Sequence, residues 1–244
     1  VSLAPSLTQN LYFLGAKDLV VGVTSYCEIA KNDHKENVAS AIKVNIEKVV
    51  SLKPDLVVTT QLTDPETINM LKKFGLRVEV FGKAHSYQEI CSQFTQLGSL
   101  IGKQSEAQAV ISNTNQRIDK VKQKVPKGKS PRVFFQIGAK PIFTVIPNTF
   151  MDDLITFAGG INIAKDLDNS SITRESVIIR NPDVILIVTM GVMGIEEKQV
   201  WEGYKNMSAV KHKKVFIIDA DKACTPTPIT FIETLEEMIR LIYN

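Results

Sequence analysis

One phrase occurs twice in this chain of 244 residues. The stretch "IEKVVSLKPDLVVTT" occupies residues 46–60, and "TRESVIIRNPDVILIVT" occupies residues 173–189. In each copy a glutamate precedes a Pro-Asp pair by the same spacing, and a run of apolar, largely β-branched residues follows. This repeat constrains the fold strongly, because it predicts two halves built on the same local plan.

Each copy of the phrase predicts a short helix followed by a strand. Glu47 and Glu175 fall in the first helical turn, where the helix dipole favours an acid. Asn45 and Thr173 stand two residues earlier and are suitable N-caps. A proline ends each helix, and the continuous apolar run after it is typical of a strand that is covered on both faces of a parallel sheet.

Strand, loop and helix patterns flank both copies. Residues 1–16 and 132–160 each read as a strand, a polar loop, a helix and a glycine, and residues 76–82 and 213–221 contain further strands. This alternation predicts an α/β fold of two Rossmann-like lobes with mostly parallel sheets.

A long helix is predicted between the lobes. Residues 105–125 contain no Gly or Pro, their apolar side chains recur at threes and fours, and Ser105 is a suitable N-cap. A helix of this length is about 30 Å long and would join the lobes as one stiff backbone helix. The predicted domains are an N-terminal lobe over 1–103, the linking helix over 104–127 and a C-terminal lobe over 128–244.

Composition and missing motifs exclude several functions. The net charge is +3, and the basic residues read as scattered, without a Lys/Arg block interleaved with aromatics, so nucleic acid is not an expected partner. No apolar run reaches the ~20 residues that span a bilayer, and an export signal is expected upstream of Val1. Because GxGxxG, P-loop and GxSxG motifs are absent, we expect no enzyme and no catalytic cofactor. A chelatase-like metal-tetrapyrrole enzyme is the alternative from another class.

Several phrases together resemble one known family. "VSLAPSLTQNLYFLGAKDLVVGVTSYC", "LKPDLVV", "NPDVILI" and "FAGGINIAKD" are similar to the helical-backbone (cluster III) periplasmic substrate-binding proteins of ABC importers, above all to members that bind vitamin B12 (cobalamin). The resemblance implies that a corrinoid is captured in the cleft between the lobes and is delivered to a membrane permease and its ATPase. Haem, a ferric siderophore and a metal ion remain alternative ligands.

The same resemblance implies where the protein acts. It predicts a monomer in the periplasm, or a lipoprotein anchored outside the cytoplasm. Contact with the membrane is expected only through the lipid anchor or the permease.

Ligand contacts are expected from the loops that follow the strands, because ligands of open α/β sheets bind at the carboxyl ends of the strands. The candidates are Ser6, Tyr26, Cys27, Thr60, Gln61, His85, Gln136, Phe143 and Cys224. Tyr26 would form an aromatic wall against a flat ligand, or else pack on its own lobe. Cys27, His85 and Cys224 form an alternative metal site, since thiolate and imidazole suit soft or borderline metals.

Three acids are candidates for contact with the permease. By the resemblance, an acid near the top of each lobe pairs with arginines of the permease. Glu66 matches this position in the first lobe, and Glu196 and Glu197 match it in the second by symmetry. The simpler reading is that each acid complements the dipole of its helix.

Overall fold

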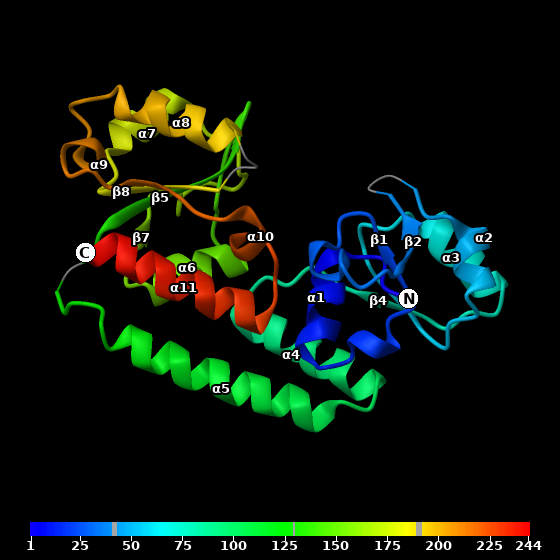
Figure 1. The fold of residues 1–244 in the computed structure, drawn as a ribbon. Coiled ribbons are helices and arrows are strands. Elements are labelled where there is room, and N and C mark those ends of the chain that lie inside the picture. Colours follow the sequence, from blue (N-terminus) through cyan, green and yellow to red (C-terminus); the bar gives the residue numbers. More distant parts are fainter. Residues whose placement is uncertain (41–42, 129, 189–191) are drawn as a thin grey trace. The chain divides into compact units, whose positions relative to one another are not determined.

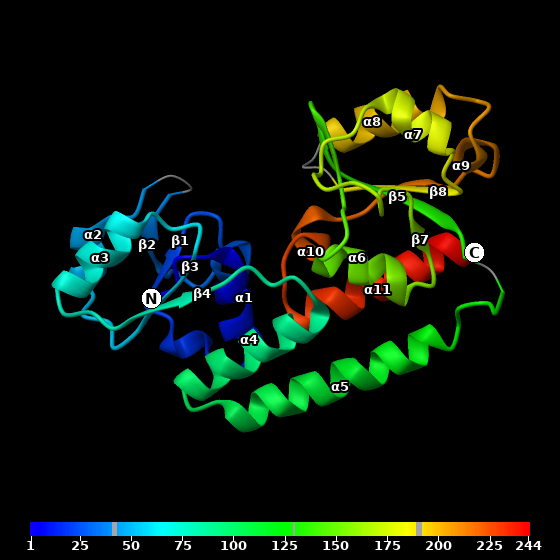
Figure 2. The ribbon, with the colours of Figure 1, turned by 180° about the vertical axis from the view of Figure 1, so that it is seen from behind.

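The computed structural model describes residues 1–40, 43–128, 130–188 and 192–244 of the chain. The chain divides into two compact units, of which unit 1 comprises Val1–Ala84 and Cys91–Ile111, and unit 2 comprises His85–Ile90 and Ser112–Asn244 (Figures 1 and 2). Each unit combines parallel strands with helices, which confirms the predicted α/β fold. No helix in the described ranges is both long and apolar enough to cross a bilayer.

Unit 1 alternates short strands with helices. Its elements are α1 (Pro5–Phe13), η1 (Lys17–Leu19), β1 (Gly22–Thr24), η2 (Glu28–Ala30), β2 (Glu36–Ala39), α2 (Ile46–Ser51), β3 (Val57–Thr60), α3 (Pro65–Lys73) and β4 (Val78–Phe81). Strands β1 and β2 pair in parallel, and so do β3 and β4.

The first residues of the chain connect these two strand pairs. The amide of Ser2 donates to the carbonyl of Gly22 at 2.9 Å, and the amide of Leu3 donates to that of Val58 at 2.9 Å. The strand that the sequence predicts at residue 1 is therefore a single parallel bridge between Ser2 and Val58. It still lies between β1 and β3, so all the strands of unit 1 end at one edge.

Unit 2 is built on a larger sheet. Its strands are β5 (Arg132–Ala139), β6 (Ile142–Thr144), β7 (Ile161–Asn162), β8 (Val184–Ile187) and β9 (Val215–Ile217), and its helices are α6 (Phe150–Phe157), α7 (Arg174–Arg180), α8 (Val192–Glu202), α9 (Ser208–Lys211), α10 (Ala220–Ala223) and α11 (Pro228–Tyr243). The strand order is β6-β5-β8-β9, with β7 beside β5, and only β6 is antiparallel to its neighbour. Helices α7 and α8 cover one face of this sheet, and α6 and α11 lie on the other (Figure 1).

The repeated phrase folds in the same way in both units. Asn45 caps α2 through its Oδ1, which accepts from the amide of Lys48 at 2.9 Å. Thr173 caps α7 through its Oγ1, which accepts from the amide of Ser176 at 3.2 Å. The predicted caps are therefore confirmed. The residue before each proline adopts a left-handed conformation, with φ of 46° at Lys53 and 42° at Asn181. The last residue of the second phrase, position 189, lies outside the described residues.

Two long helices contribute to both units. Helix α4 covers Tyr87–Leu100 and α5 covers Gln104–Lys122, and the boundary between the units crosses each of them. Helix α5 begins one residue before the predicted cap at Ser105 and ends three residues before Val125. Its buried residues include Ala107, Ile118 and Val121, as an amphipathic helix requires. The domain limits at 103/104 and 127/128 remain predictions.

Candidate ligand-binding site

A hollow of about 350 Å³ lies at the carboxyl edge of the unit 1 sheet. It forms where the N-terminal segment, β1, β2 and β3 end, and its lining includes Pro5, Tyr26, Lys43, Thr60, Leu62 and Thr63. Because this is the edge at which open α/β sheets bind ligands, the hollow is the candidate site of unit 1.

Two large apolar side chains at this edge are left in solvent. Tyr26 is 60% exposed and Leu62 is 96% exposed. Both follow strand ends in turns that threonine hydroxyls stabilise. The amide of Tyr26 donates to Thr24 Oγ1 at 3.3 Å, and the amide of Leu62 donates to Thr60 Oγ1 at 3.4 Å. Exposed apolar surface beside hydroxyl groups suits a ligand with an apolar face and a polar rim.

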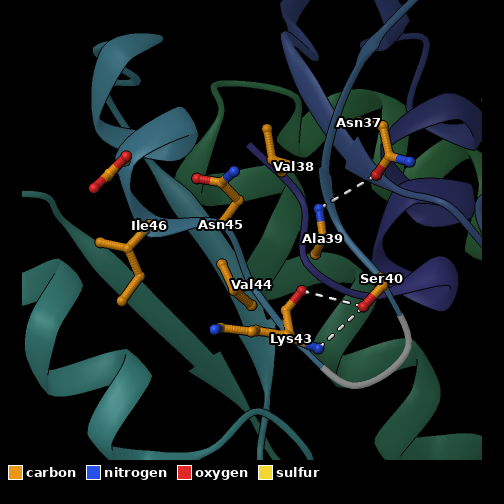
Figure 3. A pocket seen from close by; sticks show the side chains of 9 residues that line it. Asn37, Val38, Ala39, Ser40, Lys43, Val44, Asn45 and Ile46 are labelled. Atoms are coloured by element: carbon orange, nitrogen blue, oxygen red, sulfur yellow. Dashed lines mark hydrogen bonds between the residues drawn. The ribbon is translucent and has the colours of Figure 1, made fainter.

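The segment between β2 and α2 closes one side of the hollow. In this segment the Ser40 hydroxyl donates to the Lys43 carbonyl at 3.4 Å and accepts from the Lys43 amide at 3.2 Å (Figure 3). A second, more open hollow of about 560 Å³ is lined by residues 37–40 and 43–47 of the same segment. Four residues, Ala39, Ser40, Lys43 and Val44, contribute to both hollows.

Cys27 was expected among the ligand contacts, and the structure places it in the core instead. The residue is 5% exposed, and its Sγ lies 3.1 Å from Thr8 Oγ1 and 3.3 Å from Thr24 Oγ1. The Thr8 hydroxyl in turn donates to Ser2 Oγ at 2.9 Å. Cys27 therefore joins α1 to the end of β1 and does not line the hollow.

The other candidates of unit 1 divide between the hollow and its surroundings. Thr60 lines it. Ser6 is half-buried in the first turn of α1 and is not part of the lining. Gln61 is exposed, and its side-chain amide lies beside Gly82 at the end of β4, 3.8 Å from where a Cβ would stand. Ser6 and Gln61 as ligand contacts remain predictions.

At the carboxyl edge of unit 2, the Gln136 side chain belongs to a buried hydrogen-bond network. Its Oε1 accepts from Trp201 Nε1 at 2.7 Å, while its Nε2 donates to Glu197 Oε2 at 3.0 Å and to the Gly138 carbonyl at 2.9 Å. Gln136 is fully buried. The expectation that it faces a ligand is therefore wrong, because protein groups already satisfy both ends of its amide.

Glu197 was a candidate for permease docking, and its burial contradicts that role. The residue is 5% exposed, and both of its carboxylate oxygens accept from Arg174 Nη2, at 3.1 and 2.9 Å. The guanidinium of Arg174 lies 4.3 Å over the ring of Trp201, which is itself fully buried. The Glu197 carboxylate therefore connects α7, α8 and β5 inside unit 2, and it is not accessible to a partner protein.

Phe143 and His85 keep exposed surface. Phe143 is 37% exposed and packs against Gly138 across the β5–β6 hairpin, where a Cβ would stand 2.8 Å from its ring. His85 is exposed, its Nδ1 lies 3.3 Å from the Asn148 carbonyl, and its amide donates to Glu89 at 2.7 Å. Both remain candidate contacts.

The alternative metal site is not supported. Cys224 is an exposed residue, but desolvation of its thiol, together with Asp221 and Asp219, raises its pKa to about 11. The raised pKa disfavours the thiolate form of Cys224, which is the form that binds a metal. Within the described parts of the chain, no group of three or more His, Cys, Asp or Glu side chains could hold a metal ion.

Two of the predicted docking acids are accessible. Glu66 is exposed in the first turn of α3, which Asp64 caps by accepting from the amide of Thr67 at 3.0 Å. Glu196 is exposed on α8, one residue before the buried Glu197. Residues 189–191, which come between β8 and α8 in the sequence, lie outside the described residues.

A family comparison identifies the class to which this architecture belongs. The profile of the periplasmic binding protein family matches residues 1–222. The chain belongs to this family.

Individual proteins that are similar to this periplasmic binding protein support the same family assignment. YvrC of Bacillus subtilis, an uncharacterized ABC transporter substrate-binding lipoprotein, is 31% identical over 253 residues, which cover 100% of this chain and 79% of the relative. The crystal structure of a possible iron-binding (periplasmic solute-binding) protein from Staphylococcus epidermidis has a TM-score of 0.88 at 28% identity, covering 100% of this chain and 98% of the other. The periplasmic vitamin B12-binding protein of Vibrio cholerae has a TM-score of 0.82 at 25% identity, covering 99% and 94%.

Sequence reasoning missed several residues that shape the two edges of this periplasmic binding protein. Leu62 stands out as a large apolar residue within the polar stretch "TTQLTDP", and that pattern could have indicated a contact surface. Lys43 and Thr63 carry no comparable signal. Arg174 directly follows the predicted cap Thr173, but nothing in the sequence links it to Glu197 or Trp201.

Proposed function

We propose that this periplasmic binding protein is the substrate-binding component of an ABC importer and that its ligand is a corrinoid. The observation that carries the proposal is the open hollow at the carboxyl edge of unit 1, where Tyr26 and Leu62 present apolar surface beside the Thr60 hydroxyl. A corrinoid offers a broad apolar ring with a fringe of neutral amides, and this mixture matches the lining. The likeness to the Vibrio cholerae vitamin B12-binding protein supports the same ligand class.

The charges around the hollow favour a neutral ligand. Lys43 and Asp64 are the two charged residues among those that line it. Recognition of an anionic ferric siderophore would favour clustered cations, arginine above all, because the guanidinium binds carboxylates in bidentate fashion. One lysine balanced by one aspartate does not provide such a cluster.

Haem or another iron chelate is the second candidate, and one observation favours it. Tyr26 is exposed at the hollow, and a tyrosine oxygen can serve as an axial ligand of haem iron. The Staphylococcus epidermidis structure, whose name refers to iron binding, supports the same class. The two candidates differ in what they require of Tyr26, because a corrinoid needs its ring and an iron chelate needs its oxygen.

Calorimetric titration of cobalamin, cobinamide and haemin tests the proposal. We expect a micromolar or tighter Kd for at least one of the corrinoids and weaker binding of haemin. The variant Tyr26→Phe should bind the corrinoid nearly as well as the parent protein. Haemin binding that Tyr26→Phe abolishes, without corrinoid binding, would replace the corrinoid by haem. Recovery of chemically unchanged ligand distinguishes a carrier from a chelatase-like enzyme.

We propose further that the protein acts outside the cytoplasm, as a periplasmic protein or a lipid-anchored one, and that it docks on a permease through Glu66 and Glu196. Both side chains are exposed, Glu66 in the first turn of α3 and Glu196 on α8. Glu66→Gln should leave ligand affinity unchanged and slow ligand uptake by cells or proteoliposomes. Glu175→Gln is the matched control, since Glu175 is also an exposed acid in a first helical turn. Equal uptake by both variants would remove Glu66 from the docking role.

A further inference from the structure

Basic residues from two stretches of the sequence lie together at one end of unit 2. Six cations and no acid fall within residues 120–132, and "KHKK" occupies residues 211–214. The fold brings the two stretches together. A hollow of about 590 Å³ lined by Lys120, Lys124 and Arg240 also contacts Tyr243, and a neighbouring hollow lined by His212 and Lys214 contacts the same Tyr243.

This end is the amino edge of the unit 2 sheet. Arg132 is the first residue of β5, and Lys214 immediately precedes β9. Helix α9 and the last turn of α11 lie on the same side of the unit in both views (Figures 1 and 2). The candidate ligand contacts of unit 2 lie beyond the opposite, carboxyl ends of these strands, so the basic end is a separate surface.

Five lysines at this end have no carboxylate partner. Lys120, Lys124, Lys127, Lys211 and Lys213 are all exposed, and none forms an ion pair within the described ranges. We call these five lysines the basic pole.

Most acids near the basic pole are already engaged. Glu236 pairs with Arg117 at 2.8 Å, and Glu237 lies 4.0 Å from Arg240. Asp183 accepts from the Ser208 hydroxyl at 2.9 Å. Asp119 is an exposed acid on α5 beside Lys120. The helix dipole favours lysines in the last turns of α5 and α9, but it does not account for Lys127 and Lys213, which lie outside both helices. Among the described residues at this end, cations therefore outnumber acids.

We propose that the basic pole docks on the anionic headgroups of the membrane surface. The proposal rests on the extracytoplasmic, membrane-associated location proposed above, and it adds direct lipid contact to the expected anchor and permease. Each lysine close to an anionic bilayer contributes roughly a fivefold gain in binding, within a Debye length of about 8 Å at physiological salt. Docking in this way would turn the carboxyl edge of unit 2, with Glu196 on α8, away from the lipid, so it describes a state separate from docking on the permease.

Lipid fits this surface better than nucleic acid does. Single-stranded nucleic acid binding combines cations with aromatic rings on which bases stack. Tyr243 is the aromatic residue that lines both hollows at this end, but it is half-buried and its hydroxyl donates to the Ala158 carbonyl at 2.9 Å. It offers no free stacking platform.

Co-sedimentation of the full 244-residue chain with vesicles tests the proposal. One vesicle preparation is phosphatidylcholine alone, and the other contains about one third phosphatidylglycerol. The pole variant carries Lys120→Gln, Lys124→Gln and Lys127→Gln. The control variant carries Lys72→Gln, Lys73→Gln and Lys83→Gln, three exposed lysines of unit 1 without an ion pair among the described residues. The two variants have the same net charge.

We expect the parent chain and the control to bind the anionic vesicles and to lose binding at about 0.5 M salt, where the Debye length falls to roughly 4 Å. The pole variant should bind at least tenfold more weakly. Equal losses in both variants, binding to phosphatidylcholine alone, or tighter binding to an oligonucleotide than to anionic vesicles would each overturn the proposal. The pole variant should keep the ligand affinity of the parent chain, so this test fails or succeeds independently of the proposed ligand.

Discussion

The same sequence phrase leads to the carboxyl edge of the sheet in both units, but the side chains at the two edges differ in their exposure to solvent. In unit 1 the edge is open, and Tyr26 and Leu62 stand in solvent around a hollow. In unit 2 the described part of the equivalent edge contains a buried network, in which Gln136 and Glu197 bind Trp201 and Arg174 inside the protein. The repeated phrase therefore specifies the backbone, whereas the buried network of unit 2 combines Arg174 of the second copy with Gln136, Glu197 and Trp201, which lie outside it.

The edge of unit 2 is stabilised by hydrogen bonds that its buried polar side chains make to one another. The Gln136 side-chain amide accepts from the indole of Trp201 and donates to the carboxylate of Glu197. That carboxylate also accepts from the guanidinium of Arg174. Such networks rigidify a core when complete, and removal of one member leaves the others desolvated and unpaired. At the open edge Tyr26 and Leu62 remain exposed, so their side chains can contact another molecule.

The largest effect on stability is expected from a substitution that disrupts the buried network of unit 2. Glu197→Ala should lower the free energy of unfolding by about 3–5 kcal/mol, because it leaves the guanidinium of Arg174 and the amide of Gln136 without their partner. Denaturant unfolding followed by tryptophan fluorescence measures this loss. Glu196→Ala, at the exposed neighbouring position, should change stability by less than about 0.5 kcal/mol. Similar values for the two variants would show that the network contributes little.

A second test concerns the thiol of unit 2. The pKa of Cys224 is raised to about 11 by desolvation and by the nearby carboxylates of Asp221 and Asp219. Because the thiolate is the reactive form, alkylation by iodoacetamide at pH 8 should be about 100-fold slower than for a thiol of pKa 9.0 and should rise with pH until about 11. Mass spectrometry localises the product. Asp221→Asn should accelerate the reaction, and a fast reaction of the parent protein at pH 8 would revive Cys224 as a thiolate ligand.

Removal of the Tyr26 ring tests whether the edge of unit 1 contacts the ligand. Tyr26→Ala should weaken corrinoid binding by about 10- to 30-fold, or about 1.4–2 kcal/mol, and should leave the unfolding free energy nearly unchanged because the side chain is 60% exposed. Calorimetry and denaturant unfolding measure the two quantities. Ile179→Ala, at an 83% exposed position on α7, is the control and should affect neither. If Phe143→Ala weakens binding more than Tyr26→Ala does, unit 2 contributes the main contact.

The smallest effects are expected where the two units are alike. Asn45→Ala and Thr173→Ala remove equivalent caps and should each cost about 1 kcal/mol of stability. Denaturant unfolding by circular dichroism measures both. A cost that differs by more than about 1 kcal/mol between the variants would show that the likeness of the two phrases does not extend to their energetics.

Local patterns predicted the backbone of this protein well. The caps at Asn45 and Thr173, the mostly parallel sheets and the long amphipathic helix follow from side-chain spacing, which acts within a few residues. The N-terminal strand was overestimated, because only Ser2 forms a ladder bridge there. The same patterns placed Tyr26 and Thr60 at strand ends, where they line the hollow.

Side-chain roles were harder to predict because distant residues determine them. Cys27 belongs to the core because Thr8, on α1, reaches its sulfur. Gln136 is buried because Trp201, on α8, donates to it. Position at the end of a strand predicts proximity to a ligand edge, but it does not say whether the side chain turns outward or inward.

Trp201 has one further consequence, for how the protein can be studied. It is the single tryptophan of the chain, and it is fully buried in unit 2. Its emission therefore reports the melting of unit 2 and gives no direct signal from unit 1. A tryptophan introduced in place of Phe13, which packs partly buried against the core of unit 1, would supply the missing reporter and let one spectroscopic experiment follow each half of the molecule.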